Sequence, residues 1–134
     1  MSDQPVAPVP PFEPPYYTVV FTSVLADTGG ASGGASGADS DSGGEPGADA
    51  GYDETGARMD ELVASVPGFL GVESARTPGG LGITVGYFRD EEAIKRWRAD
   101  AEHRTAQKRG RDEWYEKYVV HVAKVERSYG FERA

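Results

Sequence analysis

Two histidines, His103 and His121, supply all the imidazole chemistry of this chain of 134 residues. His103 lies in the charged stretch WRADAEHRTAQ, six positions after Trp97. An imidazole with a pKa of about 6.5 can accept a proton from a phenol, and as a neutral ring it can bind ferric iron. His103 is therefore the candidate catalytic residue, and a surface or capping role is the alternative. His121 alternates with valines in VVHV, which is typical of a sheet residue.

Two aromatic side chains that precede His103 are candidates for contact with a planar substrate. Trp97 shares helical spacing with Ala93, Ile94 and Ala101, which predicts a buried position on that stripe. A core role and a place in the wall of a substrate pocket are compatible for this residue. Tyr87, in the strand-like run LGITVGYF, is the second candidate.

The segment GRDEWYEKY combines one cation with an aromatic cluster. If it is helical, spacings of three, four and seven place the following residues on one face: Arg111, Trp114, Tyr115 and Tyr118. Such a cluster can hold a planar anionic ligand by stacking and charge, and a core or dimer contact is the alternative. Acidic residues are interspersed among the basic residues between positions 95 and 111, which favours a solvated helical face and no nucleic-acid partner.

Composition narrows the class of protein. Cysteine is absent, which excludes disulfides, thiolate zinc sites, iron–sulfur clusters and a cysteine nucleophile. The start, MSDQPVAPVPPFEPP, lacks the charge and the apolar run of a secretory signal, and no apolar stretch of about 18 residues occurs. These features predict a soluble, cytoplasmic protein with no membrane partner.

Two segments differ in composition from a globular domain. Residues 1–15 are proline-rich, which predicts an extended tail. Residues 26–51 hold nine glycines and no large apolar side chain, which predicts a disordered insert. Of the net charge of −8, residues 1–50 carry −7 and residues 51–134 carry −1. We expect one domain over residues 16–131, interrupted by the insert.

Strands are predicted where β-branched and aromatic residues gather, at 16–25, 69–76, 81–88 and 118–129. The turn TPGG, at 77–80, predicts that the second and third strands form a hairpin. On the third strand the following residues share a face, on which the small ones let another group approach the backbone closely: Gly82, Thr84, Gly86 and Phe88.

Helices are predicted in the two intervals between strands that lie outside the hairpin. Asp53 is the expected cap of the first helix, and Pro67-Gly68 ends it after a stripe formed by Met59, Leu62, Val63 and Val66. Asp90 is the expected cap of the second helix, and a break is expected near Asp100.

This βαββαβ order predicts an α+β fold of the ferredoxin-like kind, with a four-stranded antiparallel sheet and both helices on one face. The strands are apolar on both sides, so the face without helices needs a cover. A homodimer is the economical solution, and a ligand pocket is the alternative.

The chain resembles the antibiotic biosynthesis monooxygenase family in VVFTSVL, VPGFLGVES, GITVGYFRDEEAIKRW and the dipeptide EH at 102–103. The resemblance covers residues 16–25 and 52–131, and it implies a dimeric α+β barrel in which sheets of two subunits face each other. Members include cofactor-independent oxygenases of polyketide-like aromatics, haem-binding oxygenases and proteins without an assigned activity. His103 matches a histidine that many members carry near the break in the second helix.

The leading functional hypothesis is therefore a monooxygenase without a cofactor or metal. A planar aromatic substrate would lose a proton in an apolar pocket, and its anion would react with O₂. The alternatives are haem binding or degradation through His103 and a non-catalytic dimeric ligand-binding module. The haem degraders of this family use an asparagine on the first strand, and this chain has no asparagine. The spacing from Trp97 to His103 is also shorter than in the staphylococcal haem degraders, where the histidine would occupy the position of Gln107.

Overall fold

Strands and helices follow one another in the order that the sequence predicts. The structure is a computed structural model that describes residues 7–26 and 48–134. Its elements are β1 (Tyr16–Leu25), α2 (Ala48–Ala64), β3 (Phe69–Arg76), β4 (Leu81–Phe88), α3 (Glu91–Ala99), α4 (Ala101–Arg109), the π-helical turn η3 (Gly110–Trp114) and β5 (Tyr115–Val125).

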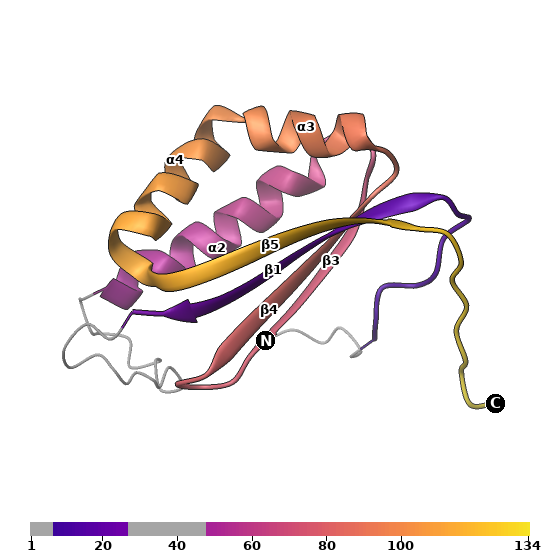
Figure 1. Cartoon of the computed structure of the whole chain (residues 1–134), viewed down its shortest axis with the longest axis horizontal. Coiled ribbons are helices and arrows are strands. Elements are labelled where there is room, and N and C mark those ends of the chain that lie inside the picture. Colours follow the sequence, from indigo (N-terminus) through magenta and orange to yellow (C-terminus); the bar gives the residue numbers. More distant parts are fainter. Residues whose placement is uncertain (1–6, 27–47) are drawn as a thin grey trace.

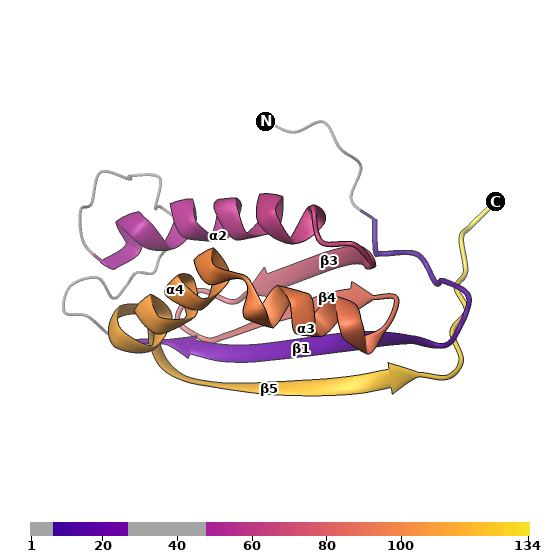
Figure 2. The ribbon, with the colours of Figure 1, turned by 90° about the horizontal axis from the view of Figure 1, so that it is seen from above.

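The strands form one antiparallel sheet in the order β3-β4-β1-β5. The first strand in the chain is therefore central, and the last strand lies at an edge. The helices α2, α3 and α4 all lie on the same side of this sheet, as Figures 1 and 2 show. This arrangement confirms the predicted α+β, ferredoxin-like fold.

The register of the sheet assigns its residues to two faces. Tyr17 lies opposite Phe88, and both pack in the core beneath the helices. Val20 lies opposite Val85 of β4 and opposite His121 of β5. Because neighbouring residues of a strand point to opposite sides, the face of Tyr17 and Phe88 is called the helix face here. The face of Val20, Val85 and His121 is called the open face.

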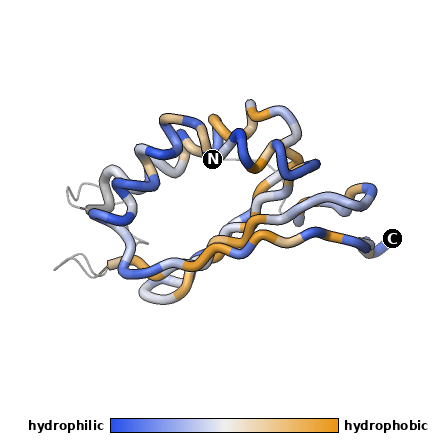
Figure 3. Tube along the Cα trace, turned by 45° about the horizontal axis from the view of Figure 1, so that its top comes forward, coloured by the Kyte–Doolittle hydropathy of each residue, from blue (hydrophilic) through white to orange (hydrophobic). Residues whose placement is uncertain are grey.

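The apolar core occupies one end of the layer between the helices and the sheet. Its buried members come from α2, β4 and α3: Val63, Phe88, Ala93 and Ile94. Trp97 and Phe69 are among the half-buried residues that pack against them. No residue of α4 is buried, and Figure 3 shows hydrophobic residues along the strands and hydrophilic ones over α4. Ala101, which we expected on the buried stripe, is exposed, because the helix changes direction just before it.

Asp100 divides the second helical segment, as predicted. Its backbone is extended, with φ −61° and ψ 126°, so it ends α3 and begins α4. The carboxylate of Asp100 accepts a hydrogen bond of 2.9 Å from the backbone N–H of His103. The predicted cap at Asp90 is also confirmed, since its carboxylate accepts from the backbone N–H of Ala93 at 2.9 Å.

Two predicted boundaries are wrong, for reasons that lie in tertiary contacts. The helix α2 begins at Ala48, so Asp53 lies inside it and residues 48–51 of the expected insert are helical. Packing of Tyr52 against Trp114 holds this first turn in place despite its glycine. The rest of the insert, residues 27–47, lies outside the described residues.

The last strand runs over Tyr115–Val125 rather than over 118–129. The antiparallel partner β1 begins at Tyr16, which pairs with Val125, so β5 ends where β1 begins.

The described part of the proline-rich tail, residues 7–15, lies against the domain without helix or strand structure. The backbone N–H of Val9 donates to the Glu73 carboxylate at 2.8 Å, and Arg89 donates to the carbonyl of Glu13 at 2.9 and 3.2 Å. Within the described residues, no helix has the length and apolarity needed to cross a membrane.

We predict that the open face of the sheet binds a second copy of the chain. Val119, on the open face of β5, leaves 52% of its surface exposed, and Leu81 and Ile83 of β4 leave 53% and 44%. A charge buried in such an interface is costly. Val119→Asp should therefore weaken dimerisation by on the order of 10²-fold or more, as measured by light scattering across a dilution series.

The matched control is Val122→Asp. Val122 is on the same strand and is similarly exposed, at 54%, but it belongs to the helix face. This variant should remain dimeric. A wild-type chain that is monomeric at micromolar concentration would contradict the expected dimer.

Candidate functional site

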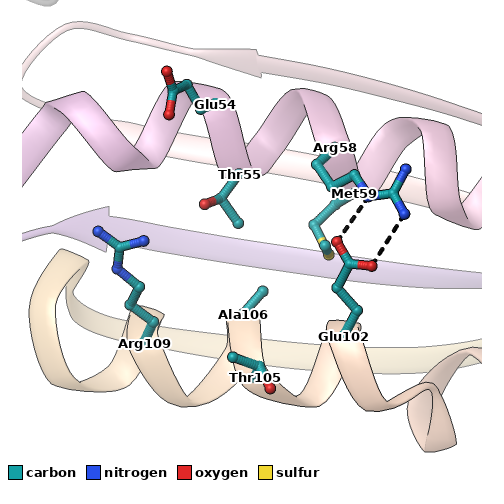
Figure 4. Close-up of a pocket in the computed structure, with 8 residues that line it drawn as sticks. All are labelled: Glu54, Thr55, Arg58, Met59, Glu102, Thr105, Ala106 and Arg109. Atoms are coloured by element: carbon teal, nitrogen blue, oxygen red, sulfur yellow. Dashed lines mark hydrogen bonds and ion pairs between the residues drawn. The ribbon is translucent and has the colours of Figure 1, made fainter.

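A cavity of about 230 Å³ lies between α2 and α4. Four of the residues around it come from each helix: Glu54, Thr55, Arg58, Met59, Glu102, Thr105, Ala106 and Arg109. Figure 4 shows most of these side chains pointing into the gap between the two helices. Met59, Ala106 and the methyl group of Thr55 provide its apolar surface. None of the site residues predicted from the sequence is among them.

One ion pair bridges the two helices at the edge of this cavity. The Arg58 guanidinium donates to both oxygens of the Glu102 carboxylate, at 2.7 and 3.1 Å (Figure 4). The guanidinium lowers the pKa of Glu102 by this hydrogen bonding. Both side chains are about half exposed, so the pair bridges the helices but adds little to the free energy of unfolding.

At its other end the cavity adjoins a group of aromatic side chains, here called the aromatic cluster. It consists of Phe21, Tyr52, Trp114, Tyr115 and Tyr118. Tyr52 precedes the cavity residues Thr55 and Met59 by three and seven positions on α2, so it shares their side of the helix. Arg109, another cavity residue, lies 4.9 Å above the Trp114 ring. The cavity and the aromatic cluster are therefore contiguous.

The turn η3 decides how the predicted aromatic residues are arranged. It ends at Trp114, and Tyr115 already belongs to β5. The expected single helical face therefore does not form, because half of its members lie in a strand. Trp114 is buried, whereas Arg111 is exposed and its guanidinium lies 3.4 Å from the Tyr118 hydroxyl. Burial, together with the nearby Tyr52 hydroxyl, raises the pKa of Tyr115.

Trp97 and His103 lie together, at the break between α3 and α4. Their rings stack with centroids 3.8 Å apart and planes 12° from parallel. The His103 Nδ1 lies 2.9 Å from the carbonyl oxygen of Trp97. A carbonyl only accepts hydrogen bonds, so Nδ1 carries the proton and Nε2 of the neutral ring carries the lone pair. Burial lowers the pKa of His103 below 6.5, which favours this neutral form at pH 7.

This geometry gives His103 a structural role besides any chemical one. The Trp97 carbonyl is at the end of α3, where it also accepts from the backbone N–H of Asp100 at 3.2 Å. The imidazole thus completes the hydrogen bonding of a helix end. His103 does not line the cavity, although its neighbour Glu102 does.

Tyr87 and His121 are placed on the open face, across the sheet from the cavity. The Tyr87 hydroxyl donates to the Glu73 carboxylate at 2.6 Å. Burial and this carboxylate raise the pKa of Tyr87 to about 12. His121 is exposed. Among the described residues, no group of three or more acidic, histidine or cysteine side chains could hold a metal ion.

The predicted site residues therefore fall into three separate places: the helix break, the aromatic cluster and the open face. The prediction missed the cavity residues Arg58 and Glu102, whose partnership spans 44 positions of sequence. It also missed Arg76 and Ser23, which form a hydrogen bond on the helix face. One signal for this last pair was present, because Gly82 had been predicted to admit a close approach to the backbone.

Comparison with known proteins places this geometry in a family. A family model described as antibiotic biosynthesis monooxygenase matches residues 44–109, which contain every residue around the cavity. The protein YqjZ of Bacillus subtilis, which is uncharacterized, is 52% identical over 81 residues, or 60% of this chain and 71% of that protein. A jasmonate monooxygenase of Pyricularia oryzae is 35% identical over 66 residues, which are 47% of this chain and 30% of that relative.

Solved structures resemble the chain in fold. SnoaB, a cofactor-independent oxygenase from Streptomyces nogalater, superposes with a TM-score of 0.59 at 14% identity, over 90% of this chain and 100% of that one. Rv0793 of Mycobacterium tuberculosis gives 0.58 at 11% identity, over 89% and 98%. At such identities the likeness concerns the fold alone.

We predict that His103 makes the stability of the fold depend on pH. Its pKa is lower in the folded chain than the ordinary value of 6.5, so the unfolded chain binds more protons between these two values. The contribution of neutral His103 to the free energy of unfolding should therefore be complete above pH 6.5 and should decrease as the pH falls below that value. Urea unfolding at about pH 7.5 and about pH 5.5 measures the difference.

His103→Phe keeps an aromatic ring over Trp97 but removes both the titration and the hydrogen bond. It should lose about 1 kcal/mol at neutral pH and show a smaller fall on acidification. His121→Gln, at the exposed histidine, should behave as the wild type. An unchanged pH dependence in His103→Phe would show that other groups cause it.

Proposed function

The chain belongs to the antibiotic biosynthesis monooxygenase family, and from that premise we propose that it is a cofactor-independent monooxygenase of planar, polyketide-like aromatic molecules. The observation that carries the proposal is the coincidence of the family match with the site. The matched residues, 44–109, run from before α2 to the end of α4 and include both walls of the cavity.

The surroundings of the cavity suit such a substrate. The aromatic cluster at its end offers ring faces and edges for a flat ligand. Arg109 contributes a cation next to this cluster. The sequence match to a jasmonate monooxygenase supports oxygenation as the reaction class.

In the proposed reaction, a methylene group of the substrate beside its aromatic system loses a proton. The resulting carbanion supplies electrons to O₂, one oxygen atom forms a carbonyl at that carbon, and the other leaves as water. The protein has to bind the flat substrate, accept the first proton and stabilise the anion. These roles need no electron carrier, because the substrate itself is oxidised.

His103 does not line the cavity, but it follows the lining residue Glu102, and it remains the candidate proton acceptor for a substrate that extends past Glu102. Its Nδ1–H is held by the Trp97 carbonyl, which leaves the lone pair on Nε2. The same arrangement, with one ring nitrogen tied to a carbonyl, is common in metal-bound histidines. Haem binding through Nε2 is therefore the second candidate function. Haem titrations of the wild type and of His103→Ala test it. If His103 is the axial ligand, the Soret shift on haem addition is seen with the wild type and lost in the variant.

We predict that filling the cavity abolishes oxygenation. Ala106 is half-buried and faces the cavity from α4. Ala106→Trp would place an indole in the space of the substrate and should lower O₂ consumption with anthrones or polyphenols at least about tenfold. An oxygen electrode measures the rate, and a melting curve verifies that the variant folds.

Gln107→Trp is the matched control, because Gln107 is the next residue of α4, is exposed and does not border the cavity. It should consume O₂ at the wild-type rate. Equal rates in the two variants would place the reaction elsewhere. If the wild-type chain binds such aromatics but consumes no O₂, it is a ligand-binding module.

A further inference from the structure

The layer between the helices and the sheet has two unlike ends. The apolar core fills the end near Phe88 and Ile94. The other end, beside the aromatic cluster, contains Ser23 of β1, Gly82 of β4 and Arg76 of β3 on the helix face. Ser23 leaves only 2% of its surface exposed, Gly82 is buried and Arg76 is half-buried. A cation is thus held on the helix face of the sheet, at the end away from the apolar core.

These three residues form a row across the sheet. Arg76 lies opposite Gly82 on β4, and Gly82 lies opposite Ser23 on β1. The Arg76 side chain crosses the glycine and donates from Nη2 to the Ser23 hydroxyl. A Cβ at position 82 would overlap the guanidinium, so this crossing depends on the absence of a side chain there. The guanidinium therefore lies directly against the backbone of Gly82, which is called the floor of the site here.

The hydrogen-bonding capacity of Arg76 exceeds what its described neighbours use. A guanidinium has five N–H donors, and a half-buried charge is costly without a partner. Within the described residues, no carboxylate lies within ion-pairing distance of Arg76, whereas the exposed Arg58 and Arg109 both have one. The oxyanion of a ligand can supply such an acceptor, and the forked guanidinium fits its geometry.

The aromatic cluster stands next to this guanidinium. The positive charge of Arg76 acts on the Tyr115 hydroxyl, where it partly offsets the effect of burial on the pKa. The Tyr115 ring contacts Phe21 and Tyr52 edge to face, at centroid distances of 5.4 and 6.0 Å. Arg76 therefore lies close to ring surfaces that suit a flat molecule.

We propose that Arg76 is the anion-binding residue of the ligand site, and that it selects planar aromatic ligands that carry an oxyanion, either a carboxylate or an ionised phenol. The inference rests on the proposed function insofar as it assigns Arg76 to the same substrate site. The ring of the ligand lies against the aromatic cluster, and its oxyanion accepts hydrogen bonds from the guanidinium. Ser23 and Gly82 are positioning residues, because they hold Arg76 in place.

The test compares two probes that differ only in charge, 2-naphthoate and its neutral carboxamide. Binding is followed by the fluorescence of the protein's tryptophans or by calorimetry, and neither method depends on turnover. The wild type should bind the carboxylate at least about tenfold more tightly than the amide, as expected for a charge-assisted hydrogen bond. Arg76→Met should abolish this preference and leave the affinity for the amide unchanged.

Gly82→Ala tests the floor independently of the charge. The added Cβ should displace the guanidinium while Arg76 itself remains, so the preference for the carboxylate should fall. Arg98→Met is the control, because Arg98 is exposed on α3, which packs at the other end of the layer. It should retain the full preference. Melting curves establish that each variant is folded.

Several outcomes would overturn the inference: no binding of either probe to the wild type, no preference for the carboxylate, or an unaltered preference in Arg76→Met. Oxygen consumption separates this inference from the proposed function. A wild type with the preference but without O₂ consumption with the aromatic substrates contradicts the monooxygenase and leaves the anion site standing. Undiminished O₂ consumption by Arg76→Met with ionised phenols contradicts the anion site alone.

Discussion

The break at Asp100 is the local feature on which the site depends. A continuous helix from α3 through α4 would run straight past α2, whereas the extended ψ of 126° at Asp100 turns α4. The carboxylate of Asp100 caps the new helix, and the His103 imidazole satisfies the carbonyl that ends the old one. Two short polar contacts thus direct an exposed, hydrophilic helix to the place where Glu102 reaches Arg58.

This turn also explains why the interior is unequal at its two ends. α3 packs onto the sheet through Ala93 and Ile94, and close packing there leaves little room. α4 contributes no buried residue, so what closes the other end is the aromatic cluster, whose members come from β1, α2, η3 and β5. Aromatic rings and hydroxyls can interact favourably with a cation such as Arg76 beside them.

The fold was predictable because local signals and global topology agree. The hairpin turn, the cap at Asp90 and the break at Asp100 each have a short sequence signature, and the structure confirms all three. The errors occur where a distant partner decides. Pairing with β1 sets the end of β5, and the contact of Tyr52 with Trp114 supports the first turn of α2. Neither partner is visible in the periodicity of its own segment.

The sequence indicated some of the residue types of the site, but not their arrangement in space. Helical spacing grouped Arg111 with Trp114 and Tyr115, but a single π-helical turn changes the phase of the chain, and a strand begins at Tyr115. The small residues of β4 indicated that another group approaches the backbone closely, but the sequence did not identify that group. That group is the guanidinium of Arg76, which comes from the neighbouring strand and is set by cross-strand register. A one-residue slip would carry the same arginine to the open face. The chemistry of this layer is therefore a property of sheet register, which short sequence motifs do not encode.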